Sequence, residues 1–193
     1  MNDIPPGIRR VCAAVGVEPH REDGEREQES LRRQMTGAIV EACSSPGLER
    51  ILLCRQSDGD VEIVVLPAGI DEPYIVAALV NGLIDVLRRI NMPLNGGDRV
   101  RLRMAVHEGI TILTGSGFAG RGVAKACRML SAPPLLAALA RSPKSDFAVM
   151  LSDPVFEDIG SFDRSLPLDR FERVEISGAV AEFREVGWIF VTQ

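Results

Sequence analysis

The sequence has few of the residues from which metal centres and disulfides are built. It contains two histidines and four cysteines, and Cys12, Cys43, Cys54 and Cys127 stand singly, without the close pairing of a zinc or redox motif. We therefore expect free, buried thiols and no histidine-based metal site. Lys and Arg are interleaved with Asp and Glu at a net charge of -5, which argues against a nucleic-acid partner.

Long apolar segments are missing as well. No apolar run approaches the ~20 residues that cross a bilayer, and the first seven residues lack both the basic start and the apolar stretch of a secretory signal. We therefore expect a cytoplasmic protein without a membrane partner. The 193 residues fit a single domain, with its core at residues 8–191 and a polar loop at residues 19–30.

Hydrophobic periodicity divides the chain into alternating strands and helices. Residues 10–15 form a short apolar run typical of a central strand, and residues 31–42 repeat apolar side chains at helical spacing. An Asp-Gly step between residues 51–54 and 61–66 predicts an antiparallel hairpin. The later expected elements are a helix at 73–90 capped by Asp71, a strand at 100–114, a glycine-rich loop at 115–122, helices at 123–130 and from 135, a strand at 147–151 followed by a helical turn, and a terminal hairpin of 171–176 and 186–191.

This order of elements predicts an α+β sandwich with a ferredoxin-like βαββαβ core and further α and β elements after it. In such a split βαβ pattern we expect a largely antiparallel sheet that carries its helices on one face. Because this fold hosts many functions, the fold alone does not indicate what the protein does.

Residues 115–120 spell Gly-x-Gly-x-x-Gly, the pattern of a dinucleotide-binding loop. The match stands in mid-chain, and no acidic residue follows about 20 positions later to bind a ribose, so a Rossmann site is not expected. The loop amides beside a helix N-terminus and Arg121 remain candidates for binding a phosphate.

Three polar residues have a structural interpretation beside a functional one. Asp60 suits a hairpin turn as well as a metal site. Arg128 fits solvent contact on a helix as well as anion binding. His107 lies on a half-buried strand, which favours a structural histidine over a catalytic base.

Two segments together resemble a hallmark of the class III nucleotidyl cyclases. Residues 101–109 read as a strand that ends in His107-Glu108-Gly109, and residues 120–130 lead from glycines into a helix. Members of that family have a strand ending in His-x-Gly, then a glycine-rich loop and a helix that carries an Asn and an Arg. Asp60 at the hairpin extends the similarity, which covers residues 8–191 and looks closest to small stand-alone actinobacterial members.

The resemblance implies a two-metal phosphoryl transfer in which two Asp side chains hold the cations. Asp60 matches the second of these carboxylates. Gly16 stands where the family has the first, and Gly16 cannot bind a metal. Glu18 and Asp58 are the nearby carboxylates, but alternation along a strand and an unfixed loop position make a rescue by them unexpected. We expect no resident cofactor, and Mg or Mn only if a nucleotide binds.

The resemblance also identifies the family's nucleotide-contacting positions in this chain. Arg128 matches the helix Arg, whereas Ala124 takes the place of the Asn. Gln56 and Gly117 take the places of the two residues that read the purine. The nucleotide-binding candidates that remain are Asp60, Gly120, Arg121 and Arg128.

We therefore expect a catalytically degenerate cyclase-like domain that serves as a nucleotide-sensing or protein-interaction module. Losing one electrostatic stabiliser costs about 10²- to 10³-fold in rate, and several are replaced here. The family's habit of forming sites between two chains implies a homodimer, or pairing with another cyclase-like chain, and a purine nucleotide as ligand. The alternative is a divergent nucleotide phosphotransferase or cyclase that uses Mg or Mn, in a heterodimer that supplies the missing carboxylate.

Overall fold

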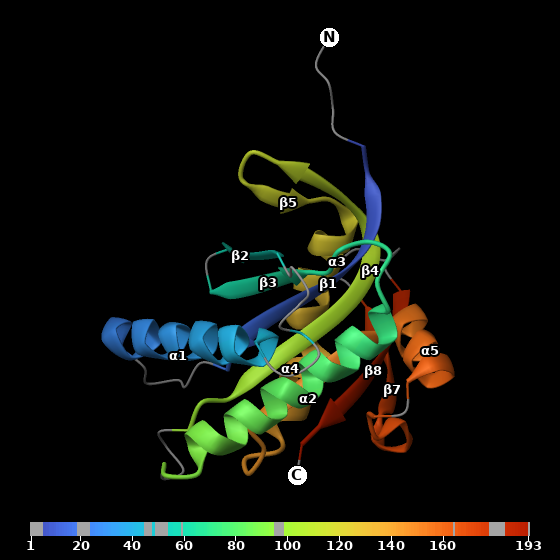
Figure 1. The fold of residues 1–193 in the computed structure, drawn as a ribbon. Helices are drawn as coiled ribbons and strands as arrows, with labels where there is room; N and C mark the ends of the chain where they lie inside the picture. The colour runs from blue at the N-terminus through green and yellow to red at the C-terminus, as the bar shows by residue number, and fades with distance from the viewer. Residues whose placement is uncertain are drawn as a thin grey trace.

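One mixed sheet runs through the computed structural model, which describes residues 6–18, 24–44, 48, 54–58, 60–94, 99–163, 165–177 and 184–192. The strand order is β2-β3-β1-β4-β6-β8-β7, and β5 pairs with β4 outside this path (Figure 1). Among the described strands only the β4–β6 pair is parallel. The strands are β1 (Ile8–Val17), β2 (Cys54–Asp58), β3 (Val61–Val65), β4 (Leu102–Thr114), β5 (Gly117–Ala119), β6 (Phe147–Ser152), β7 (Glu172–Ser177) and β8 (Arg184–Val191).

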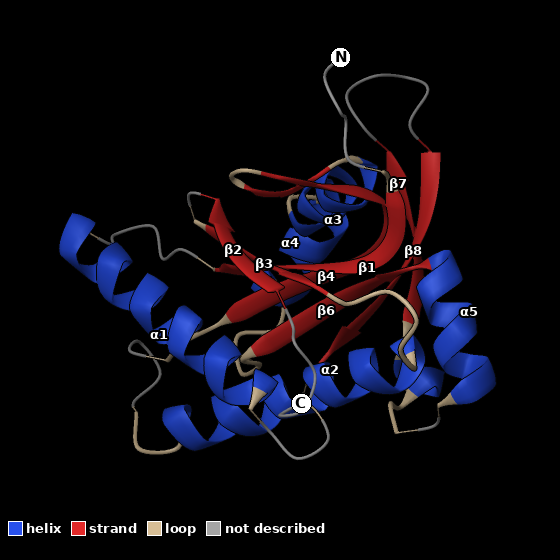
Figure 2. Cartoon of the chain, turned by 45° about the horizontal axis from the view of Figure 1, so that its top comes forward, coloured by secondary structure: helices blue, strands red, loops and turns tan. Residues whose placement is uncertain are grey.

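Helices cover both faces of this sheet. The helices are α1 (Glu25–Cys43), α2 (Glu72–Asn91), α3 (Arg121–Leu130), α4 (Pro133–Ala140) and α5 (Asp153–Phe162), with a 3-10 turn at Leu168–Arg170. Figure 2 shows α3 and α4 on the opposite side of the strands from α1 and α2. The α+β sandwich and its βαββαβ start are confirmed, but the expectation that the helices share one face is wrong.

The central strand β1 explains why both faces are covered. Val11, Ala13 and Val15 belong to the apolar core under α1, α2 and α5. Cys12 and Ala14, which alternate with them, belong to a second core under α3 and α4. Successive side chains of a strand point to opposite faces, so a strand that is apolar throughout needs helices on both.

The helix expected at residues 73–90 is confirmed as α2. The Asp71 side chain accepts a hydrogen bond from the backbone N–H of Tyr74 at 3.3 Å, as an N-cap residue does. Leu79, Leu83 and Leu87 lie on one buried stripe of the helix. Asp71 and the apolar period therefore determine where α2 begins and which face it buries.

The polar loop expected at residues 19–30 is wrong for its second half. Residues 25–30 form the first turns of α1, and the Glu27 carboxylate accepts from the Gly24 N–H at 2.8 Å. Glu, Arg and Gln are good helix formers, and these first turns face solvent, where charged side chains carry no burial cost. Residues 19–23 lie outside the described part of the chain.

The hairpin before α2 is confirmed, and its first strand, β2, continues to Asp58. β2 pairs antiparallel with β3 from Cys54 opposite Val65 to Asp58 opposite Val61. The polar residues after Cys54, expected to be a turn, are strand residues because β2 is the exposed edge of the sheet. Residues 51–53 and 59 lie outside the described residues. Cys54 is exposed and Cys43 and Cys127 are half-buried, which corrects the expectation of buried thiols at these positions; Cys12 is buried, and the four cysteines are free.

The glycine-rich segment at residues 115–122 is only partly a loop. β5 pairs back on β4 to form an arm, and α3 begins at Arg121. A Cβ atom at Gly109 would come within 2.7 Å of the Gly122 Cα, and Gly120 has a φ of 118°. Glycine at these positions allows α3 to cross β4 at close range.

One stretch, Arg121–Ala140, is long and apolar enough by length and composition to cross a membrane, a match that the expectation from the sequence did not include. The structure divides this stretch into α3 and α4, with Pro133 beginning the second helix. Leu135 and Leu139 of α4 are fully buried in the core on that face of the sheet. The apolar side chains of the stretch are thus accounted for by packing within the domain.

Candidate functional site

Gly16 and Asp60 line one cleft, which we call the Gly16 cleft. It has a volume of about 440 Å³ and lies where the end of β1, the first half of α1, the β2–β3 hairpin and the end of α3 meet. Its lining residues are Gly16, Val17, Gln28, Leu31, Arg32, Asp60, Val61, Arg103, Leu130 and Ser131. Two positions that the resemblance assigns to metal binding therefore do come together.

Position 16 is directed at the interior of this cleft. A Cβ atom built on Gly16 would lie 3.2 Å from Leu130 Cδ2 and 3.8 Å from the backbone oxygen of Asp60. A carboxylate at this position would thus stand beside Asp60. Glycine supplies no ligand there, so only one of the two expected carboxylates is present.

The remaining carboxylate is held by a cation from α1. The Arg32 guanidinium forms an ion pair with Asp60, whose side chain is 71% exposed. One helical turn later, Thr36 donates a hydrogen bond to Glu62 Oε1 at 3.1 Å, and that oxygen also accepts from the Ser57 hydroxyl at 2.5 Å. These contacts hold α1 against the β2–β3 hairpin.

A second arginine closes the other side of the cleft. Arg103 of β4 stands opposite Gly16 in the antiparallel register. Its two terminal nitrogens donate to the carbonyl oxygens of Leu130 and Val17, each at 3.0 Å. Burial lowers the pKa of Arg103 from its ordinary value, and nearby Glu18 opposes that shift; an arginine nonetheless keeps its proton in a protein. Arg103 thus joins the end of α3 to the end of β1.

The residues of the cleft do not fit a pair of divalent cations. In the described part of the chain, no group of three or more His, Cys, Asp or Glu side chains is placed to hold a metal ion. Glu18 does not replace the missing ligand, because it forms an ion pair with Arg101 at 2.5 Å and does not line the cleft. Asp58 does not line it either.

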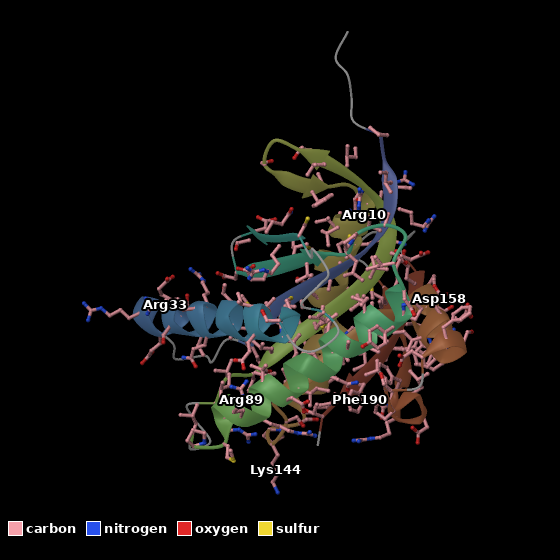
Figure 3. All side chains as sticks on the ribbon, in the orientation of Figure 1. Arg10, Arg33, Arg89, Lys144, Asp158 and Phe190 are labelled. Carbon is pink, nitrogen blue, oxygen red and sulfur yellow. The ribbon has the colours of Figure 1, made fainter. Side chains whose placement is uncertain are left out.

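Gln56 and Gly117, the two positions expected to read a purine, touch each other. Gln56 Oε1 accepts from the Phe118 N–H at 2.6 Å, and Gln56 Nε2 donates to the Phe118 carbonyl at 2.9 Å. A Cβ atom at Gly117 would lie 2.5 Å from Gln56 Oε1. The amide of Gln56 therefore binds the backbone of the β4–β5 arm. Arg10, which is labelled in Figure 3, adds to this contact, because its guanidinium lies 5.1 Å from the centre of the Phe118 ring.

The other candidates lie along α3, outside the Gly16 cleft. Gly120 is the N-cap of the helix, and Arg121, Ala124 and Arg128 are exposed at a spacing that puts them on one side of it. A helix of this length spans about 15 Å, so the Gly120 end is far from the Leu130 end that lines the cleft. Arg128 is not among the residues that line the Gly16 cleft, although it precedes the lining residue Leu130 by only two positions.

His107 is buried on the face of β4 that packs against α3. It is 8% exposed, and burial, followed by the charges of Lys125 and Arg9, lowers its pKa from 6.5 to about 4. A histidine that stays neutral over the physiological range and lies away from the cleft fits the structural interpretation given by the sequence.

Arg32 and Arg103 are the residues that the sequence argument did not identify. Arg103 lies two residues before Ala105 in β4, and such residues of a strand share one face of the sheet. The face of Arg103 could therefore be inferred once Ala105 is assigned to the face that packs against α3. Arg32 carries no local signal, because its partner Asp60 is 28 positions away in the sequence and belongs to another element.

Comparison with known proteins identifies the fold of this chain. No protein-family model and no curated protein matches the sequence. The structure is similar to an adenylate/guanylate cyclase/hydrolase from Silicibacter pomeroyi, with a TM-score of 0.63 and 15% identity over 96% of this chain and 98% of that one. It is also similar to the guanylyl cyclase Cya2, with a TM-score of 0.65 and 14% identity over 98% and 96% of the two chains.

A third similar structure is the catalytic core of a rhodopsin-guanylyl cyclase with converted specificity, solved with ATPαS. Its TM-score is 0.59 at 13% identity, and the match covers 95% of each chain. These identities are low, but the superpositions extend over nearly whole chains. The protein therefore has the fold of adenylate and guanylate cyclase catalytic domains, which confirms the class III resemblance at the level of the fold.

Proposed function

We propose that this chain is a catalytically degenerate cyclase-like domain that acts as a regulatory module, sensing a purine nucleotide and pairing with a second cyclase-like chain. The observation that carries the proposal is the state of the two metal positions. Gly16 offers no ligand, and Asp60 is engaged by Arg32. Two-metal chemistry needs both carboxylates to hold the cations that stabilise the attacking and leaving oxygens.

Nucleotide binding is supported by the cleft itself. Its volume of about 440 Å³ lies within the usual range for small-molecule sites, which is ~300–1,000 Å³. A protein with the same fold has been solved with ATPαS. The ligand proposed for this chain is a purine nucleotide whose base is not read by Gln56, because that amide is engaged with Phe118.

Dimerisation is supported by the separation of the candidate residues into two surfaces. Arg121 and Arg128 lie on an exposed side of α3 that does not line the Gly16 cleft. A twofold dimer could bring the α3 side of one protomer against the cleft of the other, as the cyclase resemblance implies. Sedimentation of the purified protein should give a dimer; a monomer at all concentrations would remove this part of the proposal.

Turnover tests the proposal as a whole. We expect the purified protein, incubated with ATP or GTP and Mn²⁺, to release neither cyclic nucleotide nor pyrophosphate when the products are separated by chromatography. A cyclase of the same fold, assayed in parallel, shows that the conditions support catalysis. Cyclic nucleotide formed by this chain alone would overturn the proposal.

A further inference from the structure

The lining of the Gly16 cleft includes positively charged side chains. The titratable residues among its lining are Arg32, Arg103 and Asp60, so two guanidinium groups face one carboxylate. Positive charge is therefore in excess among the lining residues, in a chain whose net charge is -5, while Glu29 pairs with Arg32 from outside the lining. An excess of positive charge in a cleft attracts anionic ligands.

Arg103 and Arg32 each neutralise a negative feature of the cleft. Arg103 donates to the carbonyl of Leu130, at the α3 end where a helix carries partial negative charge, and to that of Val17. Arg32 neutralises Asp60 from the opposite wall. In a two-metal site, divalent cations would supply this positive charge.

Arg32 also has donors to spare. A guanidinium group has five N–H donors in a planar fork, and only one of its terminal nitrogens pairs with Asp60. Its other terminal nitrogen forms an ion pair with Glu29 at 3.8 Å, a distance longer than a hydrogen bond, so its N–H groups can still donate to a ligand. Arginine suits a phosphate group because two parallel N–H groups match two phosphate oxygens.

We propose that the Gly16 cleft binds the phosphate chain of a nucleotide without any divalent cation, with Arg32 providing the charge that a metal ion provides in cyclases. This proposal rests on the proposed function, because it assumes that a nucleotide is the ligand. It adds that the nucleotide binds as the free anion and that Arg32 contacts its phosphates.

The test measures the binding of ATP and of GTP to the full chain by calorimetry, once in EDTA and once with Mg²⁺. We expect equal affinity in EDTA, or tighter binding there, because Mg²⁺ neutralises part of the phosphate charge that Arg32 binds. Arg32→Gln should weaken binding in EDTA by about 10- to 100-fold, the range for one charge-assisted hydrogen bond. Arg33→Gln is the matched control, since it removes the same charge from an exposed neighbour on α1 (Figure 3) and should leave affinity unchanged.

A second variant tests the same proposal independently, in case Arg32→Gln alters folding. Asp60→Asn removes the carboxylate that repels phosphate, so it should bind ATP in EDTA at least as tightly as the unmodified protein. At a metal-dependent site the same substitution would abolish binding instead. Inorganic triphosphate is a further probe, and we expect it to compete with ATP.

The outcomes separate this inference from the proposed function. Binding that appears only with Mg²⁺ or Mn²⁺, or that is lost in Asp60→Asn, overturns the metal-free site and leaves nucleotide sensing standing. Equal weakening by Arg33→Gln and Arg32→Gln overturns the role of Arg32, because it would reflect the net charge of α1 alone. Absence of binding by ATP and GTP under both conditions overturns nucleotide sensing, and the metal-free site with it.

Discussion

The side-chain amide of Gln56 pairs with the backbone of Phe118 through two hydrogen bonds, 2.6 Å and 2.9 Å long. A primary amide and a peptide group are complementary in the same way as the donor and acceptor edges of two bases. In this chain the complementarity is satisfied internally, between the edge strand β2 and the β4–β5 arm. Gln56 therefore stabilises the arm, and it is not available to bind a base.

Removing the Gln56 amide should destabilise the fold. Gln56→Ala deletes two hydrogen bonds and leaves the Phe118 N–H without its partner, so we expect the free energy of unfolding to fall by about 1–3 kcal/mol. Chemical denaturation measures this change. Gln34→Ala, an exposed position on α1, is the control and should stay within about 0.5 kcal/mol. Equal stability of the two variants would show that the Gln56–Phe118 pair does not hold the arm.

The close crossing of α3 over β4 gives a second prediction. Gly109→Ala places a methyl group 2.7 Å from the Gly122 Cα, a backbone atom that cannot turn aside, and should cost about 1–3 kcal/mol of stability. Gly37→Ala is the matched control in the middle of α1, where a Cβ atom meets nothing within 4 Å. It should raise stability by about 0.4–1 kcal/mol. A Gly109→Ala variant as stable as Gly37→Ala would refute the role given to this glycine.

His107 should make the fold less stable in mild acid. Burial lowers the pKa of His107 from 6.5 to about 4, so the unfolded chain takes up the proton first. The contribution of the neutral ring to the free energy of unfolding is complete above pH 6.5. It is lost as the pH falls from 6.5 to about 4, and it changes no further below that. From a pKa difference of this size we expect about 3 kcal/mol in total.

Two measurements isolate this contribution from the carboxylates that titrate in the same range. The ring resonances of His107 should titrate near pH 4 by NMR. In His107→Gln, the loss of stability between pH 6.5 and 4 should be smaller than in the unmodified protein by about the same 3 kcal/mol. A ring that titrates near its ordinary pKa would contradict the burial argument.

The metal site should be recoverable in part. Gly16→Asp adds a carboxylate beside Asp60, at the cost of a small shift of the Leu130 side chain, whose Cδ2 would lie 3.2 Å from the new Cβ. Because Arg32 still neutralises Asp60, we expect Mn²⁺ to raise the melting temperature of the Gly16→Asp/Arg32→Gln double variant and not that of either single variant. A Mn²⁺-dependent rise in the unmodified protein would mean that Gly16 is not the missing ligand position.

Much of the fold could be predicted because its signals are local. Asp71 and the apolar stripe after it define α2. Alternation along residues 100–106 located β4 but not its burial, because Ala105 and His107 are buried on the second face. The position of β2 could not be predicted in the same way, since its polar residues are strand residues only because they pair with β3. To predict that helices cover both faces of the sheet, one must know that β1 is a central strand. That position depends on its pairing with both β3 and β4.

The residues of the candidate site also differ in whether the sequence could identify them. The sequence placed Gly16 and Asp60 in one site through family resemblance, and the structure brings them together. It did not identify the partners of these residues, because Arg32 and Arg103 act through contacts between distant segments. The pairing of Gln56 with the β4–β5 arm could not be predicted for the same reason, although the sequence argument had identified Gln56 and Gly117 separately.

The most direct test of the central claim, that the two-metal site has been lost, is the paramagnetic effect of Mn²⁺ on the amide resonances of the protein. Mn²⁺ broadens resonances of nuclei close to the ion that it binds. The account predicts no selective broadening of the amides of Gly16, Val17 and Val61, with or without ATP, at Mn²⁺ concentrations that broaden them in the Gly16→Asp/Arg32→Gln variant. Selective broadening of these amides in the unmodified protein would contradict it.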